Sequence, residues 1–379
     1  MRIFVPKESN ETEKRVPIIP ATVKKLSAKE GLEIIIESGM GESSRFPDAE
    51  YEEVGATVSS NRDEELKLAD MVLRLNKPPK EEIGLLKKGA IHVSYLDPFN
   101  ERDLIDEFLE KGINAISMEM IPRTTLAQKM DALSSQANLA GYMAVILASE
   151  RLDKVLPMMM TPSGTITPSR VFIIGVGVAG LQAIATAKRL GARVDAFDTR
   201  PVVEEQVQSL GAKFVKIDLG EMGETKDGYA KELTEEQQAK QREAMADVCA
   251  KADIVITTAQ LFGRKAPVIV TKDMVDRMQP GSVIVDLAVE TGGNVEGSEL
   301  DQEVEVNGVR ILGLGNMPGR ISQNASQMYS ANLSAMIEHF WDDEEKAFKL
   351  NTEDEIMAGC LVTQDGAIQS QMIKDHYAK

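Results

Sequence analysis

The sequence predicts an α/β protein with two doubly wound parallel-sheet domains, joined by two long helices with a cleft between them. Its 379 residues suit two domains better than one. Segments typical of strands and helices alternate through residues 1–130 and again after residue 170, as in parallel sheets covered by helices. Long helical stretches at 134–154 and 322–341 separate these regions. We therefore assign residues 1–133 and 325–379 to the first domain, and residues 134–324 to the second.

The first domain alternates short apolar runs with helical segments. We expect strands at 3–5, 33–37, 71–75 and 114–117, and helices at 20–30, 51–54, 63–68 and 100–111. This region has no G-x-G-x-x-G fingerprint. The tail, residues 342–379, is expected to return to this domain after the second long helix.

The second domain opens with a strand–turn–helix–strand unit. A β-branched and aromatic run at 171–174 is followed at once by Gly175, Gly177 and Gly180, spaced as G-x-G-x-x-G. A helix is expected at 181–190, and a strand at 194–197 that ends on Asp198. An acid about 20 residues after such glycines completes the dinucleotide-binding fingerprint of Rossmann folds. Both domains are therefore expected to be Rossmann-like.

Each element of this unit suits NAD(H). Gly175 permits a tight turn, Gly177 lets a pyrophosphate approach the backbone, and Gly180 lets the helix pack on the strand. The helix N-terminus offers free N–H groups to phosphates. Asp198 can bind the ribose hydroxyls of NAD and would repel the 2′-phosphate of NADP, although Arg200 could accommodate that phosphate. With Asp198 present we favour NAD; the alternative is a glycine-rich turn in an ordinary α/β domain.

The rest of the second domain is expected to continue the parallel sheet. Strands are predicted at 214–217, 254–257, 282–286 and 310–312, and a loop at 157–168. A polar, charged segment at 218–241 is typical of a lid or of disorder. Because ligands bind at the carboxyl ends of strands and often between domains, we expect the nicotinamide in the cleft.

Composition excludes several classes of function. The formal net charge of −17 disfavours nucleic acid and anionic membrane surfaces as direct partners. Two distant cysteines, Cys249 and Cys360, are typical of core residues in a reducing cytoplasm. Three scattered histidines predict no metal site. No run approaches the roughly 20 apolar residues of a spanning helix, so we expect a soluble chain without membrane insertion.

The loop before the first long helix, R-T-T-L-A-Q-K-M-D-A-L-S-S-Q at 123–136, is the second candidate site. Arg123 and Asp131 could pair, and Gln128 and Ser134 could bind a carboxamide or a ribose. The alternative is that Asp131 or Ser134 only caps the helix. Since no Ser–His or Cys–His arrangement is present, we expect hydride transfer by the cofactor, with the protein supplying orientation.

Four stretches resemble the NAD(H)-binding component, domain I, of proton-translocating transhydrogenases. They are P-R-T-T-L-A-Q-K-M-D-A-L-S-S-Q-A-N-L-A-G-Y at 122–142, P-M-M-M-T at 157–161, G-V-G-V-A-G-L-Q-A-I-A-T-A-K-R-L-G-A at 175–192 and P-G-S-V-I-V-D-L-A-V-E-T-G-G-N at 280–294. The resemblance covers essentially the whole chain. It implies a homodimeric cytoplasmic subunit that transfers hydride from NADH to NADP⁺ on a partner, domain III. A membrane partner, domain II, would couple transfer to proton movement and hold the subunit at the inner face of the membrane.

The resemblance also assigns roles to individual residues. The nicotinamide loop corresponds to Arg123, Gln128, Asp131 and Ser134, of which Asp131 and Ser134 hold the carboxamide and Gln128 reaches toward the second nucleotide. The adenosine end corresponds to Val178, Asp198, Thr199 and Arg200, the tip of a mobile loop to Gly228 and Tyr229, and a further cofactor contact to Gln260.

Alanine dehydrogenases resemble the same chain and are the chief alternative. Arg15 corresponds to their substrate-binding arginine, but Asn76 stands where they have a lysine, with Lys77 adjacent, and Asp97 stands where they have a histidine. A carboxylate would repel an anionic 2-oxo acid and leaves no imidazole to move a proton. A third possibility is a non-catalytic protein that senses NAD or serves as a scaffold.

Overall fold

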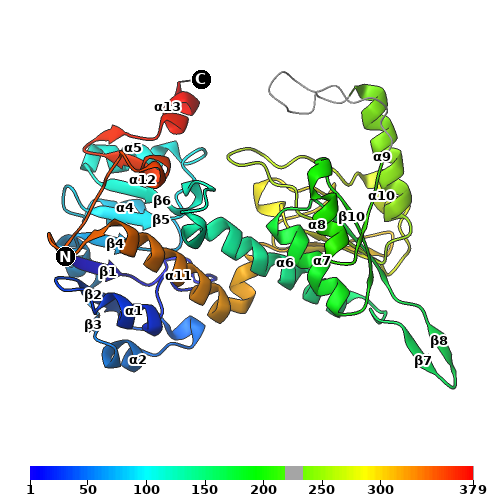
Figure 1. Ribbon diagram of the computed structural model, residues 1–379, viewed down its shortest axis with the longest axis horizontal. Coiled ribbons are helices and arrows are strands. Elements are labelled where there is room, and N and C mark those ends of the chain that lie inside the picture. The colour runs from blue at the N-terminus through cyan, green and yellow to red at the C-terminus, as the bar shows by residue number, and fades with distance from the viewer. Residues whose placement is uncertain (218–233, 379) are drawn as a thin grey trace. The chain divides into compact units, whose positions relative to one another are not determined.

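The computed structural model describes residues 1–217 and 234–378 and divides into two compact units (Figure 1). Unit 1 comprises Met1–Gln136 and Pro318–Lys379, and unit 2 comprises Ala137–Met317. Each unit contains its own mostly parallel sheet and its own buried core, so the predicted α/β class with two parallel-sheet domains is confirmed. The boundaries lie a few residues from those placed on the sequence. The helix α6 (Ala132–Arg151) crosses the first of them.

Unit 1 is built on an eight-stranded sheet with the order β19-β18-β6-β5-β4-β1-β2-β3. Its strands are β1 (Arg2–Val5), β2 (Glu33–Glu37), β3 (Thr57–Ser59), β4 (Met71–Leu73), β5 (Ile91–Ser94), β6 (Asn114–Ser117), β18 (Leu361–Gln364) and β19 (Ala367–Ile368). The first six strands are parallel and reverse their order at β1, as in a Rossmann fold. The antiparallel β18 and β19 extend one edge, so the tail belongs to this sheet.

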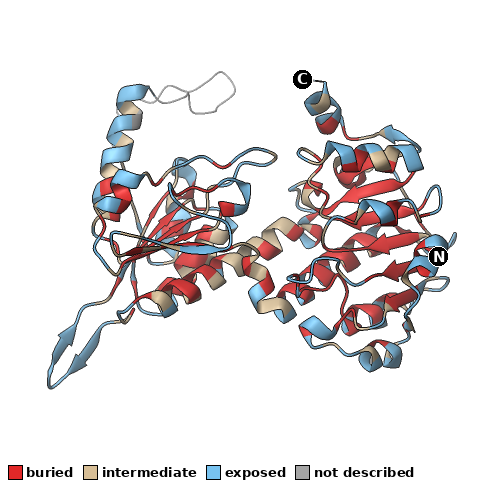
Figure 2. Ribbon diagram, turned by 180° about the vertical axis from the view of Figure 1, so that it is seen from behind, coloured by how far each residue is buried: buried red, intermediate tan, exposed pale blue. Residues whose placement is uncertain are grey.

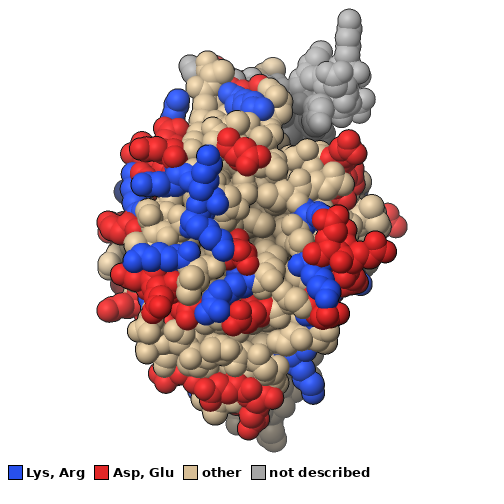
Figure 3. Space-filling model, turned by 90° about the vertical axis from the view of Figure 1, so that its left-hand side faces the viewer, with Lys and Arg blue, Asp and Glu red and all other residues tan. Residues whose placement is uncertain are grey.

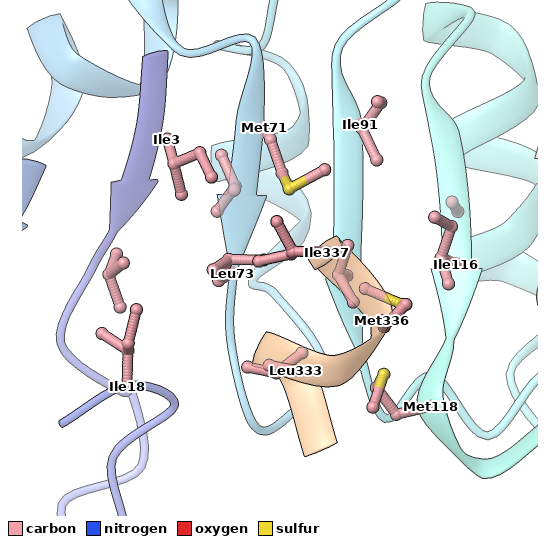
Figure 4. Close-up of a cluster of buried hydrophobic side chains, with 14 of the residues drawn as sticks. Ile3, Ile18, Met71, Leu73, Ile91, Ile116, Met118, Leu333, Met336 and Ile337 are labelled. Atoms are coloured by element: carbon pink, nitrogen blue, oxygen red, sulfur yellow. The ribbon is translucent and has the colours of Figure 1, made fainter. Parts of the chain in front are cut away.

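The helices of unit 1 cover this sheet. They are α1 (Pro20–Leu26), α2 (Asp48–Glu53), α3 (Arg62–Leu68), α4 (Lys80–Ile83), α5 (Arg102–Lys111), α11 (Ser322–Phe340), α12 (Glu355–Cys360) and α13 (Gln371–Tyr377). Three side chains of α11, Leu333, Met336 and Ile337, point into the buried cluster that the strands supply (Figure 4). Two serines of α11, Ser326 and Ser330, accept backbone N–H bonds from Val16 and Ile19. The second long helix is therefore part of the first unit's core.

Unit 2 is built on a seven-stranded sheet with the order β11-β10-β9-β12-β13-β15-β14. Its strands are β9 (Arg170–Ile174), β10 (Arg193–Phe197), β11 (Lys213–Phe214), β12 (Ile254–Thr257), β13 (Val283–Asp286), β14 (Gln302–Val306) and β15 (Val309–Gly313), and its other helices are α7 (Val178–Arg189), α8 (Glu204–Ser209), α9 (Glu235–Cys249) and α10 (Lys272–Asp276). The central strands are buried on both faces (Figure 2). Strand order reverses between β9 and β12, which is where ligands bind in open α/β sheets.

Two predicted loops contain regular structure. Residues 157–168 form a hairpin of β7 (Met159–Thr161) and β8 (Gly164–Ile166), so the assignment of this stretch as loop is wrong. The polar segment at 218–241 ends in the first turns of α9, because Thr234 and Gln237 form a capping box that starts this helix. Residues 218–233, including Gly228 and Tyr229, lie outside the described residues. Among the described helices, none is both long and apolar enough to cross a bilayer.

Candidate functional site

The three fingerprint glycines form the turn between β9 and α7, and each has a different steric environment. Gly175 has a φ of 93°, which disfavours other residues. A Cβ on Gly180 would lie 2.0 Å from the carbonyl oxygen of Gly175, so only glycine lets helix and strand approach this closely. A Cβ on Gly177 would meet no atom within 4 Å. Gly177 therefore leaves open space above the backbone, as the approach of a pyrophosphate requires.

The helix that follows directs its first amides toward this turn. Gly177 is the residue before the first turn of α7, and the first intrahelical bond runs from Leu181 N to Gly177 O at 2.9 Å. The amides of 178–180 precede that ladder, so they remain donors for an anion beside the positive end of the helix dipole. Val178, the first residue of α7, is 37% exposed.

Asp198 follows β10 and binds the glycine turn directly. Its Oδ2 accepts the N–H of Val176 at 2.8 Å, and its Oδ1 accepts the N–H of Arg200 at 2.8 Å. The Arg200 guanidinium also pairs with it at 2.9 Å, whereas Thr199 is exposed. Burial alone would raise the pKa of the Asp198 carboxyl, but hydrogen bonds from Arg200 and Val176 hold that pKa below its usual value. Asp198 is therefore an anion in a partly buried position.

The end of β12 lies against the same turn and is held by residues that sequence reasoning missed. The Thr258 hydroxyl donates to Gly175 O at 3.0 Å. The Asn294 side chain accepts the N–H of Ala259 at 3.0 Å and donates to Ala259 O at 2.8 Å. Asp286 in turn accepts the N–H of Asn294 at 2.9 Å. The only signal in the sequence was the stretch P-G-S-V-I-V-D-L-A-V-E-T-G-G-N, which contains both residues without revealing their contacts.

Gln260, the remaining candidate in unit 2, is exposed just beyond this clamp. Its Nε2 donates to Leu287 O at 2.9 Å. The structure thus brings the glycines, Asp198, Arg200 and the end of β12 together at the switch point of one sheet. Open space over Gly177, free helix amides and a buried carboxylate are the features that fit the pyrophosphate and a ribose of a dinucleotide.

The loop candidates lie in unit 1, where Asp131 caps α6. Its carboxylate accepts the N–H of Ser134 at 2.8 Å and the Ser134 hydroxyl at 2.6 Å. Arg123 and Gln128 are exposed, and within the described ranges no ion pair joins Arg123 to Asp131. The anticipated Arg123–Asp131 pair is therefore absent here, because the carboxylate is directed into the helix N-terminus.

The turn that carries Gln128, the 3-10 helix Gln128–Met130, is anchored from α11. Asn332 donates to Lys129 O at 2.8 Å and accepts the Ser135 hydroxyl at 2.7 Å. Met130 is buried beneath the turn. A rigid base under an exposed Gln128 is suited to presenting that side chain to a neighbouring molecule. Sequence reasoning missed Asn332, which is about 200 residues away along the chain.

The positions that distinguish alanine dehydrogenases are also in unit 1. Arg15 is buried, pairs with Glu13 at 2.8 Å and donates to Gln136 at 3.0 Å. The Asn76 amide donates to Glu13 at 3.1 Å, and Lys77 pairs instead with Glu101 at 2.5 Å. Asp97 accepts a hydrogen bond from Asn100 at 2.8 Å. Neither a lysine nor a histidine therefore stands beside Arg15 at these two positions.

No group of three or more His, Cys, Asp or Glu side chains in the described ranges is arranged to hold a metal ion. Cys249 and Cys360 are buried, and burial raises the pKa of both thiols to about 12. On the face drawn in Figure 3, basic side chains alternate with acidic ones rather than forming a broad basic surface.

Comparisons with known proteins agree along the whole chain. Residues 4–140 match the alanine dehydrogenase/PNT N-terminal domain, and residues 144–371 match the C-terminal domain. The chain is 45% identical over 375 residues to the first polypeptide of the split NAD(P) transhydrogenase subunit alpha of Rhodospirillum rubrum, covering 97% of each. The crystal structure of transhydrogenase from Sinorhizobium meliloti matches with a TM-score of 0.87 at 46% identity, covering 97% of this chain and 100% of that one.

Alanine dehydrogenases are more distant. That of Halomonas elongata is 28% identical over 370 residues, covering 93% of this chain and 94% of the relative. Both kinds of relative share domains that imply NAD(H) binding. The chain belongs to the alanine dehydrogenase/PNT family, and within it to the branch of the transhydrogenase alpha subunits.

Proposed function

We propose that this chain is the NAD(H)-binding component of a proton-translocating transhydrogenase. It transfers hydride directly from NADH to NADP⁺ bound on a partner, domain III, and a membrane partner, domain II, couples this transfer to proton movement. The observation that carries the proposal is the 45% identity to a transhydrogenase alpha subunit over 97% of both chains. The chain then works at the cytoplasmic face of the membrane, held there by its partners.

The residues divide the work of binding and orientation. Gly177 and the amides at the start of α7 receive the pyrophosphate, and Asp198 receives the adenosine ribose. Asp131 and Ser134 hold the carboxamide, while Gln128 faces the second nucleotide. When bound, NADH supplies the hydride from its nicotinamide ring. The chain's own task is to fix the geometry, because effective transfer needs reacting atoms about 3–3.5 Å apart.

The residues around Arg15 argue against alanine dehydrogenase activity. That reaction needs a proton donor for the 2-oxo group, and Asp97 and Asn76 offer no imidazole or ammonium. The adjacent Lys77 is committed to Glu101. A purely sensing role predicts NADH binding without transfer. Mixing the chain with domain III, NADH and an NADP⁺ analogue separates this role from the proposal, because only a transhydrogenase component transfers hydride.

Replacing Gln128 with Asn is expected to slow hydride transfer about tenfold or more while NADH affinity stays nearly unchanged. The side chain is exposed on a rigid turn, so shortening it removes one orienting contact, worth about 0.5–1.5 kcal/mol, from the partner's nucleotide. A misplacement of about 1 Å can cost around 100-fold in rate. The measurement is stopped-flow transfer to an NADP⁺ analogue with saturating domain III, beside equilibrium NADH binding.

The matched control for this experiment is Gln371→Asn, the same change on the exposed face of α13, where transfer is expected to remain at the wild-type rate. Equal small losses of binding and transfer in Gln128→Asn, or no loss of transfer, contradict the assignment of this loop to two nucleotides.

We also propose that the chain is a homodimer. The hairpin of β7 and β8 exposes Met158, Met159, Met160 and Ile166, at 58, 43, 73 and 51%. An apolar group of this kind on an exposed hairpin marks an interaction surface (Figure 2). A second copy that covers it buries the same segment of both chains, as a two-fold interface does.

The variant Met160→Lys is expected to shift the mass measured by light scattering at micromolar concentration from dimer toward monomer. A charge in the contact would have to be desolvated, which opposes association. Met372→Lys, which changes a methionine exposed at 56% in unit 1, should leave the mass unchanged. A monomeric wild-type chain would refute the dimer.

A further inference from the structure

The carboxylate of Asp198 has no free acceptor position in this structure. Its Oδ1 accepts the backbone N–H of Arg200 at 2.8 Å and the guanidinium Nε at 2.9 Å. Its Oδ2 accepts the N–H of Val176 at 2.8 Å and the guanidinium Nη2 at 2.9 Å. An ionised carboxylate offers about four lone-pair positions, and all four are used.

The four donors are of two kinds. Two are backbone amides, one in the glycine turn and one just after β10, and they hold the fold. The other two belong to the guanidinium, whose planar fork matches both oxygens at once. A ribose presents the same number of donors in a similar arrangement, because its 2′- and 3′-hydroxyls are neighbours. The guanidinium thus occupies the positions that a ribose diol needs.

The arginine is anchored weakly compared with the acid it covers. The Asp198 side chain is 7% exposed, whereas that of Arg200 is 58% exposed. Besides Asp198, the guanidinium contacts Val176 O at 3.2 Å. Exposed ion pairs contribute only about 0–1 kcal/mol. The fork can therefore leave without unfolding the turn, while Asp198 and its amide donors stay in place.

We propose that Arg200 is a latch on the ribose-binding acid: it occupies the diol position of Asp198 in the free protein and must swing away for NAD(H) to bind. This inference rests on the proposed function, because it assumes that Asp198 receives a ribose. The latch also sets the selectivity between the two cofactors. A released guanidinium lies next to the 2′ position, where it contributes nothing essential to NADH but is the cation that a 2′-phosphate needs.

Removing the fork should therefore move the two affinities in opposite directions. In Arg200→Gln, NADH no longer displaces an ion pair, and its dissociation constant is expected to fall about two- to fivefold. NADPH loses a charge-assisted contact, and its dissociation constant is expected to rise roughly tenfold. In Arg200→Lys, the charge remains without the fork, so NADH should tighten while NADPH binding is largely kept.

The experiment is isothermal titration calorimetry of the full chain with NADH and with NADPH, at two salt concentrations. The gain in NADH affinity of Arg200→Gln over wild type should shrink at high salt, because screening weakens an exposed ion pair in the wild type. Arg151→Gln is the matched control: it removes a bidentate pair with Glu303 near the opposite edge of the same sheet and should change neither affinity. Circular dichroism melts establish that the variants are folded.

The outcomes separate the latch from the proposed function. Tighter NADH and weaker NADPH binding by Arg200→Gln support the latch. Unchanged or weaker NADH binding by both Arg200 variants overturns it, while wild-type affinity and transfer remain intact. A wild-type chain that binds no NADH overturns the proposed function itself.

Discussion

A Gly177→Ala variant is expected to fold as stably as the wild type and to bind NADH about 100-fold more weakly. The added methyl group meets no protein atom within 4 Å, and the φ of −86° at this position is one that alanine adopts readily. The methyl group enters the space that the pyrophosphate needs. Separating the phosphates from the backbone amides removes charge-assisted bonds worth about 3 kcal/mol together, which corresponds to about 100-fold in affinity.

Gly180→Ala is the matched comparison in the same turn. Its methyl group would lie 2.0 Å from the Gly175 carbonyl oxygen, so β9 and α7 must separate, at a cost of about 3 kcal/mol. Calorimetric NADH binding and thermal melts of both variants distinguish the two roles. If Gly177→Ala melts early, or binds NADH normally, the assignment of this turn to the pyrophosphate is wrong.

The sequence predicted most of the fold because periodicity and turn signals are local. The runs at 33–37, 114–117 and 254–257 gave strands with the bounds found in the structure. The short β3 and β5 were missed: β3 is partly exposed, and β5 carries His92 and Ser94 within a buried strand. The hairpin of β7 and β8 was missed because its many prolines and threonines, read locally, favour a loop.

The candidate site was predictable where a residue's role depends on its neighbours along the chain. The glycine spacing and Asp198 followed from one strand–helix–strand unit. Contacts between distant residues were not predictable, because a single sequence contains no signal for them. Asn332 supports Lys129 across about 200 residues, and Asn294 reaches Ala259 across 35 residues. The closure of Asp198 by Arg200 depends on a side-chain conformation, which spacing does not determine.

Asp286 is the centre of the network that these distant contacts form, and its removal should have the largest effect on stability. The residue is completely buried. Its carboxylate accepts the N–H groups of Ala288 at 3.0 Å, Asn294 at 2.9 Å and Val295 at 3.2 Å, and the Thr257 hydroxyl at 3.2 Å. In Asp286→Ala these donors lose their partner, and an unpaired buried donor costs about 1–3 kcal/mol.

We therefore expect Asp286→Ala to lower the free energy of unfolding by about 4 kcal/mol, measured as a shift of the urea midpoint. NADH affinity of the folded fraction should also fall, because Asn294 is released and its clamp on Ala259, beside the Gly175 turn, loosens. Asp276→Ala, which removes an exposed carboxylate of the same unit, is the control and should change stability far less and affinity not at all. If Asp286→Ala lost stability but kept wild-type NADH affinity, the network would support the sheet alone; only a joint loss ties Asp286, through Asn294, to the geometry of the dinucleotide site.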